Sequence, residues 1–260
     1  MSTDTPKNLY AVERYNLILD IADAQGRVEV SALADRLGVT PETIRRDLRT
    51  LESRGRLRRV HGGALPISDD AREPSTLERL GRQRDEKQRI AHAALAEVPV
   101  EGTILLDAGT STLALAAALP ADQELVVVTN SPAIASALQD KTATVYLLGG
   151  QLRGRTGAAV GVWAQQALAD VRVDVAFMGA NGFTVGWGFS TPDQAEADTK
   201  QAMVRAAKRV VVLADSSKAG RTHFHRFATI DDVDLLITDT ALDAETAEEL
   251  EQTGLEVLRS

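Results

Sequence analysis

The segment between Gly38 and Gly63 constrains the fold of this chain more than any other part of the sequence. Thr40 can cap a helix through its side-chain oxygen, and Pro41 suits the first helical position, where no backbone donor is needed. Apolar residues then recur at helical spacing, at Ile44, Leu48 and Leu51. The segment therefore predicts a helix with one buried stripe and arginines on its other faces.

Two further helices are predicted ahead of it, over residues 10–25 and 30–37. Gly38 can adopt a left-handed conformation and end the second of them. The short turn that follows would set the third helix across the first, as in a helix-turn-helix. Residues 56–60 then alternate charged and apolar side chains as a short strand does. Together these elements predict a winged helix-turn-helix.

An exposed arginine face on a helix suits the DNA major groove, where guanidinium groups bond guanine edges and phosphates. Residues 41–65 carry seven arginines and three carboxylates, a local net charge of +4 in a chain of net charge −8. Such a patch marks a polyanion contact confined to one module, although a solvated surface helix is the plain alternative. We expect Thr43, Arg45 and Arg46 to read bases and the strand arginines to hold phosphates. The predicted DNA contacts are Thr40, Thr43, Arg45, Arg46, Arg49, Arg56, Arg58, Arg59 and His61.

Length predicts more than one domain. The chain has 260 residues, 44% of them hydrophobic, and is longer than a typical domain with a single hydrophobic core. We expect a DNA-binding domain over 1–65, a polar, proline-bounded linker over 66–75 and a second domain over 76–260, opened by one long helix at 76–98.

Several classes of protein are disfavoured by composition. The chain has no cysteine, which excludes disulfides and thiolate metal sites. No signal-like segment or membrane-length apolar run is visible, so we expect a cytoplasmic protein that contacts no membrane. His223 and His225 could share a strand face, but a hydrogen-bonded pair is favoured over a metal site. No metal and no cofactor is expected.

Beyond residue 102 the sequence alternates strand and helix patterns. Strands are predicted at 103–107, 124–128, 144–148, 174–178, 209–214 and 234–238, and helices near 112–119, 133–138, 162–169 and 193–207. This alternation predicts an α/β fold with a doubly wound, mainly parallel sheet. Ligands of such sheets bind beyond the carboxyl ends of the strands.

Polar clusters fall at those ends, at 107–112, 129–131, 149–150, 179–182 and 215–218. Glycines, hydroxyls and a helix start in the first cluster suit a phosphate group. A structural turn is the alternative at each cluster, but their recurrence at one sheet edge favours a shared site.

The clusters predict a pocket for a small phosphorylated polyol. Carboxylates and amides would bond sugar hydroxyls, whereas Lys200, Lys218 and Arg153 would counter the phosphate charge. Glu196 and Lys200 are also spaced for an ordinary i,i+4 surface ion pair, which stays open. The predicted ligand-binding residues are Asp107, Gly109, Thr110, Ser111, Thr112, Thr129, Asn130, Gly149, Gly150, Arg153, Asn181, Gly182, Glu196, Lys200 and Lys218.

The motifs TIRRDL (43–48) and RVHGGA (59–64) resemble the DNA-binding signature of the DeoR family of bacterial transcriptional regulators. The later clusters DAGTST, TN, GG, GANG, E-x-x-x-K and DSSK resemble the sensor domain of that family, in the same order. The resemblance implies a repressor of sugar catabolism or uptake genes that leaves double-stranded operator DNA on binding a phosphorylated sugar. It also implies a sensor that shares its fold with ribose-5-phosphate isomerases and glucosamine-6-phosphate deaminases.

Segments 149–161 and 180–200 look most like actinobacterial regulators of fructose uptake, which implies fructose 1-phosphate as the effector. Gly186 and Trp187 depart from the pattern, and the indole could alter which sugar fits or simply pack on the sheet. A homodimer is the base expectation for such a regulator, with a tetramer as the alternative. Two rival functions are an isomerase- or deaminase-like enzyme that uses Asp107 and Glu196 as acid and base, and an architectural DNA-binding protein without a ligand.

Overall fold

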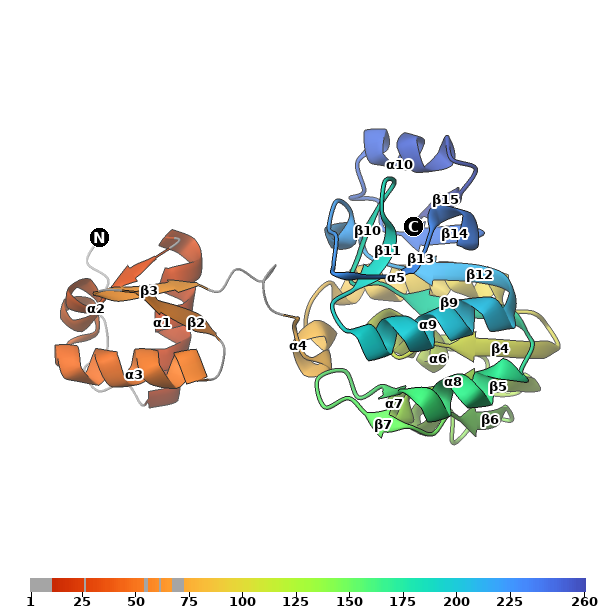
Figure 1. Cartoon of the computed structure of the whole chain (residues 1–260), viewed down its shortest axis with the longest axis horizontal. Coiled ribbons are helices and arrows are strands. Elements are labelled where there is room, and N and C mark those ends of the chain that lie inside the picture. Colours follow the sequence, from red (N-terminus) through yellow and green to blue (C-terminus); the bar gives the residue numbers. More distant parts are fainter. Residues whose placement is uncertain (1–10, 26, 54–55, 61, 67–72) are drawn as a thin grey trace. The chain divides into compact units, whose positions relative to one another are not determined.

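The computed structural model describes residues 11–25, 27–53, 56–60, 62–66 and 73–260. The chain divides into two compact units, Met1–Pro74 and Ser75–Ser260, and each has its own hydrophobic core (Figure 1). No helix in the described part of the chain combines the length and the apolar character needed to cross a bilayer.

The first unit is a winged helix-turn-helix, as the sequence predicts. Its described helices are α1 (Ala11–Gln25), α2 (Val30–Leu37) and α3 (Pro41–Ser53). Its strands are β1 (Val28–Glu29), β2 (Leu57–Val60) and β3 (Gly63–Pro66), which form an antiparallel sheet in the order β1-β3-β2.

The turn between α2 and α3 forms for the expected reasons. Gly38 ends α2 at φ 64°, in the left-handed region. The Thr40 hydroxyl then accepts the Thr43 N–H at 3.2 Å, which satisfies one of the free donors of the first turn of α3. The apolar stripe of α3 is buried against α1 and α2 in a core that includes Ile18 and Leu33.

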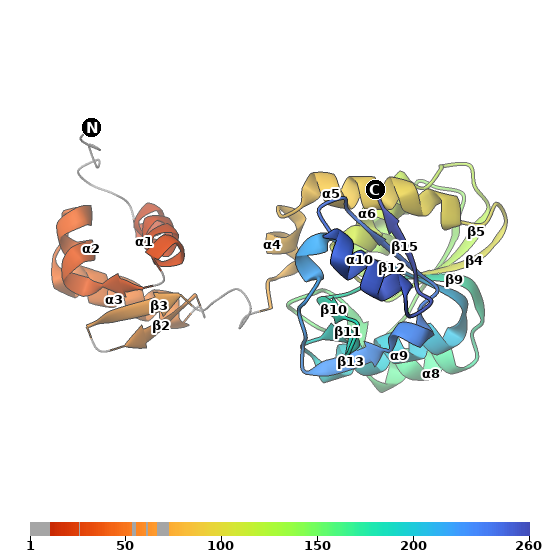
Figure 2. The same cartoon turned by 90° about the horizontal axis from the view of Figure 1, so that it is seen from above.

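The second unit is built on seven parallel strands in the order β15-β14-β12-β9-β4-β5-β6 (Figure 1). Figure 2 shows part of this sheet from above, with β4, β5, β9, β12 and β15 labelled. The strands are β4 (Gly102–Leu106), β5 (Leu125–Thr129), β6 (Thr144–Leu147), β9 (Val173–Gly179), β12 (Ala207–Leu213), β14 (Leu235–Thr238) and β15 (Glu256–Arg259). Consecutive strands run outward from β4 in one direction and from β9 in the other. The carboxyl ends of β4 and β9 therefore form the switch point at which such sheets bind ligands.

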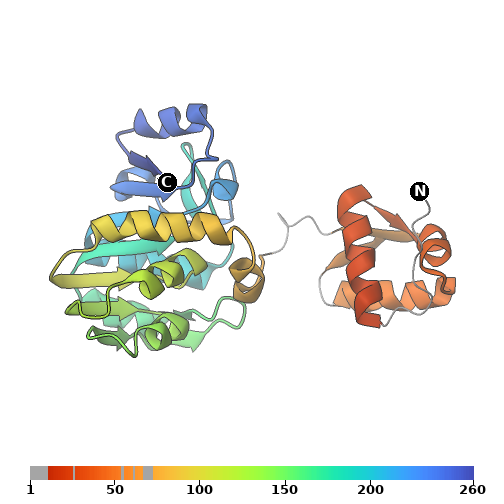
Figure 3. The same ribbon diagram turned by 180° about the vertical axis from the view of Figure 1, so that it is seen from behind.

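Helices cover both faces of this sheet. The helices α5 (Arg84–Ala94), α6 (Thr110–Ala118) and α7 (Pro132–Ala137) share one core with alternate strand residues, and Figure 3 shows α5 lying across that face. The opposite face packs against α8 (Val162–Ala169), α9 (Gln194–Ala206) and α10 (Ala244–Glu251). The doubly wound architecture is thus confirmed.

Short strands that the sequence analysis did not predict complete the unit. An antiparallel sheet of β10 (Gly182–Thr184), β11 (Gly188–Thr191) and β13 (His225–Ala228) packs its phenylalanines Phe183, Phe189 and Phe227 into the second face. The strands β7 (Gln151–Leu152) and β8 (Ala159–Val160), each two residues long, pair as an antiparallel hairpin. Single 3₁₀ turns occur at η2 (Leu95–Glu97), η3 (Ser216–Lys218) and η4 (Ile230–Asp232).

The expectation of one long helix over 76–98 was wrong. The segment breaks into α4 (Thr76–Leu80), a turn, α5 and η2. Gln83 is left-handed in the turn, at φ 49°. The Lys87 ammonium donates to the carbonyls of Arg79, at 2.5 Å, and Arg82, so a buried cation satisfies the groups that the break exposes.

Candidate functional site

Helix α3 presents arginines on the face opposite its buried stripe. Glu42 accepts hydrogen bonds from Arg45 at 3.2 Å and Arg49 at 3.0 Å, so the charge of both is partly balanced. The exposed Arg46 side chain has no hydrogen-bond or ion-pair partner among the described residues. In contrast, Asp47 is buried and pairs with Arg14 of α1 at 2.5 Å. This pair holds α3 against α1 while Arg46 stays available for DNA.

The wing, formed by strands β2 and β3, adds further cations beside α3. Arg56 and Arg59 are exposed, and the Arg59 guanidinium lies 3.8 Å from Glu52 on α3. The wing and α3 therefore lie close enough to contact one duplex together. His61 and the side chain of Arg58, both predicted DNA contacts, lie outside the described residues.

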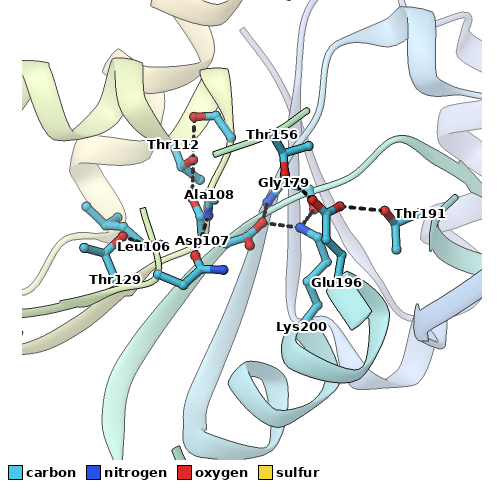
Figure 4. Close-up of polar contacts among 12 residues, drawn as sticks. Leu106, Asp107, Ala108, Thr112, Thr129, Thr156, Gly179, Thr191, Glu196 and Lys200 are labelled. Atoms are coloured by element: carbon cyan, nitrogen blue, oxygen red, sulfur yellow. Dashed lines mark hydrogen bonds and ion pairs between the residues drawn. The ribbon is translucent and has the colours of Figure 1, made fainter. Parts of the chain in front are cut away.

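In the second unit, Asp107 and Lys200 form a buried ion pair at the switch point of the sheet (Figure 4). Asp107 follows β4, and Lys200 lies on α9. The carboxylate also accepts the Gly179 N–H at 3.0 Å, and the ammonium donates to the Gly179 carbonyl at 3.0 Å. Burial raises the pKa of Asp107, and Lys200 opposes that rise. The Lys200 charge is therefore balanced within the protein.

A second buried carboxylate, Glu196, lies one helical turn away on α9. It accepts hydrogen bonds from the Thr156 hydroxyl and from Thr191 at 3.1 Å (Figure 4). It also accepts one from Arg153 at 3.1 Å. Arg153 also pairs with Asp193 at 3.1 Å. The surface ion pair of Glu196 with Lys200 is therefore absent, because each of the two has a different partner. The loop between β7 and β8 supplies both Arg153 and Thr156 and closes over this carboxylate.

The start of α6 offers donors next to these carboxylates. Thr110 and Ser111 are each only 7% exposed, yet neither hydroxyl has a partner in the described part of the chain. The first-turn N–H groups of a helix also lack intrahelical partners, and its dipole favours an anion. Thr112 differs, because its hydroxyl donates to the Asp107 carbonyl at 2.6 Å. With Gly109 as N-cap, this end of α6 is suited to a phosphate group.

Lys218 belongs to a basic cluster that the sequence analysis did not find. It is half-buried, and no hydrogen-bond or ion-pair partner is present for its ammonium within the described residues. Burial lowers the pKa of Lys218; Asp215 opposes the shift, whereas Arg221, Arg79 and Arg82 add to it. Arg79 belongs to α4 and Arg82 to the turn after it, more than a hundred residues earlier in the chain, so no local pattern could connect them to Lys218.

Other predicted ligands mainly hold the loops together. The Thr129 hydroxyl donates to the Leu106 carbonyl at 2.7 Å. The Asn130 side chain accepts the Ala108 N–H at 2.9 Å and donates to the Ala159 carbonyl at 3.1 Å. These contacts fit the alternative in which the polar residues fix the turns, and they leave Asn130 with little capacity for a ligand.

Among the glycines and asparagines predicted to bind the ligand, some have packing roles and one, Asn181, is available to a ligand. Gly149 is exposed, whereas Gly150 packs closely on β8. A Cβ on Gly182 would lie 2.4 Å from the Arg221 carbonyl oxygen, so this glycine permits close backbone packing. Asn181 is half-buried, and its side chain has no hydrogen-bond partner among the described residues, so its amide is available to a ligand.

Trp187 and the histidines take structural positions. The Arg226 guanidinium stacks over the Trp187 ring at 4.9 Å, so the indole packs against β13. His225 begins β13 and His223 lies two residues before it, and the described residues contain no group of three or more potential His, Cys, Asp or Glu metal ligands.

Comparison with known proteins identifies both units. Residues 14–70 match the model of the DeoR-like helix-turn-helix domain, and residues 82–240 match that of the DeoR C-terminal sensor domain. The structure of ribose 5-phosphate isomerase A from Methanocaldococcus jannaschii aligns with 53% of this chain and 55% of its own, at a TM-score of 0.40 and 17% identity.

Relatives align along nearly the whole chain. The HTH-type transcriptional regulator GlpR of Haloferax volcanii is 40% identical over 95% of this chain and 96% of its own. A regulator named FruR from Bacillus subtilis is 41% identical over 87% and 90%, and the glycerol-3-phosphate regulon repressor of Escherichia coli is 32% identical over 87% and 90%. The protein is therefore a DNA-binding regulator and not an enzyme: it belongs to the DeoR family of transcriptional regulators.

Proposed function

We propose that this protein represses genes of sugar catabolism or uptake in the cytoplasm and leaves its operator when the second unit binds a phosphorylated sugar. In this proposal a homodimer, or a tetramer built from dimers, presents two α3 helices to operator half-sites about 10 bp or a multiple apart. Thr43, Arg45 and Arg46 read bases, whereas the wing arginines hold phosphates. Thr40, Arg49 and His61 complete the proposed contact set.

The start of α6 carries the sensor part of the proposal. Thr110 and Ser111 are each 7% exposed as residues, and their hydroxyl oxygens, which have no partner among the described residues, remain accessible to a ligand. A half-buried cation, Lys218, is unpaired among the described residues too. Hydroxyl, amide and ammonium donors together match the oxygens of a phosphate. Asp107, Asn181 and Glu196 lie at the same sheet edge, where their oxygens and amide can bond sugar hydroxyls.

Fructose 1-phosphate is the effector we propose. Its support is the resemblance of segments 149–161 and 180–200 to fructose-uptake regulators. The name of the Escherichia coli relative, glycerol-3-phosphate regulon repressor, supports the wider class of small phosphorylated polyols.

The test is binding of the purified chain to the DNA upstream of its own gene, at fixed salt, against fructose 1-phosphate, fructose 6-phosphate, glucosamine 6-phosphate and ribose 5-phosphate. We expect fructose 1-phosphate alone to release the DNA. Release by another compound would replace the effector, and tight binding indifferent to all four would contradict the sensor proposal.

A pair of variants separates the two units. Lys218→Ala is expected to keep operator affinity and to blunt release. Lys208→Ala is the matched control, because Lys208 is exposed and pairs with Asp174 near the start of β12. Loss of DNA binding in Lys218→Ala would contradict this division of labour.

A further inference from the structure

Helix α4 is the first element of the second unit, and its start is held by the β7–β8 loop that covers Glu196. Ser75 caps it, directly after Pro74, the last residue of the first unit. The Thr76 N–H donates to the Arg155 carbonyl at 3.1 Å, and the Thr76 hydroxyl donates to the Thr156 carbonyl at 2.8 Å. Because the Thr156 hydroxyl itself donates to Glu196, two successive hydrogen bonds connect a pocket carboxylate to α4.

The other end of α4 is held by a buried cation. The Lys87 ammonium donates to the carbonyls of Arg79 and Arg82 on either side of the turn. Helix α4 also packs against α6, whose first turn carries Thr110 and Ser111. Helix α4 therefore packs against the helix whose start carries these donors, and Arg79 of α4 and Arg82 just after it lie within electrostatic range of Lys218.

Arg79 is incompletely satisfied in this position. Its Nη2 donates weakly to the Thr76 hydroxyl, at 3.3 Å, and its Nε is buried without a hydrogen-bond partner. A buried donor without a partner is destabilising, and more so when it is charged. Positive charge is also in excess here, because Lys87 and Lys218 both lie within electrostatic range of Arg79, and Asp215 is the acidic group that faces both lysines in the described part of the chain.

We propose that the Arg79 guanidinium is a ligand of the effector's phosphate group, and that this contact makes α4 the element through which the sensor acts on the DNA-binding unit. A guanidinium offers adjacent Nε and Nη donors that match two phosphate oxygens. The phosphate then lies between the start of α6, Lys218 and α4, so occupancy of the site restrains the helix that follows the first unit. This inference rests on the proposed function, because it requires an effector that carries a phosphate.

The test compares full-length Arg79→Gln with Arg84→Gln. Arg84 is exposed, lies five residues further on and has no partner among the described residues, so its removal changes the net charge equally. The probe is fructose 1-phosphate, measured by titration calorimetry, with unphosphorylated fructose as the reference ligand. We expect affinity to fall by about tenfold or more in Arg79→Gln and by less than about twofold in Arg84→Gln, as the loss of a charged hydrogen bond requires.

Arg79→Lys guards against a folding artefact. It keeps the charge but removes the forked donor, so we expect it to fold as the wild type does and to bind with intermediate affinity. Hydrogen exchange supplies a second readout: amides of residues 76–83 should exchange more slowly in wild-type protein saturated with effector.

The outcomes separate the two proposals. The role of Arg79 and α4 would be overturned if Arg79→Gln and Arg79→Lys bound the effector as tightly as the wild type. It would also be overturned if the effector left the amide hydrogen exchange of residues 76–83 unchanged. Either result would leave the proposed function standing. If the wild type binds no sugar phosphate of the panel, the proposed function fails, and the role of Arg79 fails with it.

Discussion

A buried ion pair between Asp107 and Lys200 organises the switch point of the sheet. The two side chains are 2% and 5% exposed, and Gly179 bonds both of them through its backbone. Burying two charges has a desolvation cost that their attraction offsets only when the geometry is satisfied on all sides. The pair therefore fixes the relative position of β4, β9 and α9 more than it adds to stability.

Removal of one partner should accordingly be costly. Lys200→Met is expected to lower the free energy of unfolding of the second unit by about 3–5 kcal/mol, because it leaves the Asp107 charge buried without its partner. The measurement is urea unfolding of the full chain. Lys208→Met, which breaks an exposed pair with Asp174, should cost less than about 1 kcal/mol. Equal effects of the two variants would contradict a buried, coupled pair.

The pH dependence of effector binding should report Lys87. Burial lowers its pKa to about 8; Asp215 opposes the shift, and Lys218 and Arg79 add to it, with Glu86 opposing. A bound phosphate raises this pKa again, so binding takes up a proton. Affinity is then highest below pH 8 and falls as pH rises through 8, by at most about tenfold per unit.

Titration calorimetry in two buffers of different ionisation enthalpy measures this proton uptake. The range pH 7.5–9.5 is chosen because it lies above the second pKa of the phosphate group, near 6, so the ligand itself does not titrate. Lys87→Met should make the profile less steep, and Lys218, whose pKa burial also lowers, accounts for the slope that remains. Lys141→Met should not, although Lys141 also donates to two backbone carbonyls, those of Ala117 and Leu119. A flat wild-type profile would contradict the role of Lys87.

The sequence predicted which residues gather at this sheet edge but not how they pair. The predicted order of strands and loops correctly placed Asp107, Glu196 and Lys200 close to one another. Local spacing offered Glu196 as the partner of Lys200, whereas the observed partner, Asp107, lies 93 residues away in the chain. Pairing of buried charges depends on the packed structure, and periodicity carries no information on it.

At the scale of elements, long periodic segments were predictable and short ones were not. Helices α2, α3 and α8 follow from their apolar spacing, and six strands of the main sheet follow from their β-branched runs. The hairpins β7–β8 and β10–β11 are two to four residues long per strand, and they form because distant segments pack on them. The break between α4 and α5 has a local cause instead, since Lys87 satisfies the exposed carbonyls of residues only eight and five positions earlier.

The recognition helix yields the element-scale prediction. Arg46→Ala should cost about 1–3 kcal/mol of operator binding, because its guanidinium is the exposed one on α3 that Glu42 does not engage. Fluorescence anisotropy with operator and with unrelated DNA at the same salt measures the effect. Unrelated DNA serves as the internal control and should lose less affinity. Equal losses on both would assign Arg46 to phosphates and leave base reading to other residues.

At the scale of the whole molecule, two ligands of the same charge sign bind different units. The net charge of −8 repels DNA as a whole, so operator binding depends on the local basic patch and should fall steeply with salt. In the proposed function the effector releases the operator, and linkage then requires each ligand to weaken the binding of the other by the same factor. The hydrogen bond from the Thr76 hydroxyl to the Thr156 carbonyl joins α4 to the β7–β8 loop, so it can transmit that coupling from the effector site to α4.

Thr76→Val should therefore weaken coupling, leave operator affinity unchanged and alter effector affinity only slightly, through loss of the long 3.3 Å contact from Arg79 to the Thr76 hydroxyl. Loss of the bond to the Thr156 carbonyl removes about 1 kcal/mol, which corresponds to roughly a fivefold smaller factor by which effector reduces operator affinity. The four affinities of the cycle, each ligand with and without the other, measure it at one salt concentration. Thr253→Val is the matched control, since its hydroxyl also donates to a carbonyl, that of Leu250, beyond α10. If Thr76→Val lowers effector affinity instead and leaves the ratio unchanged, the bond shapes the pocket but transmits nothing to the DNA-binding unit.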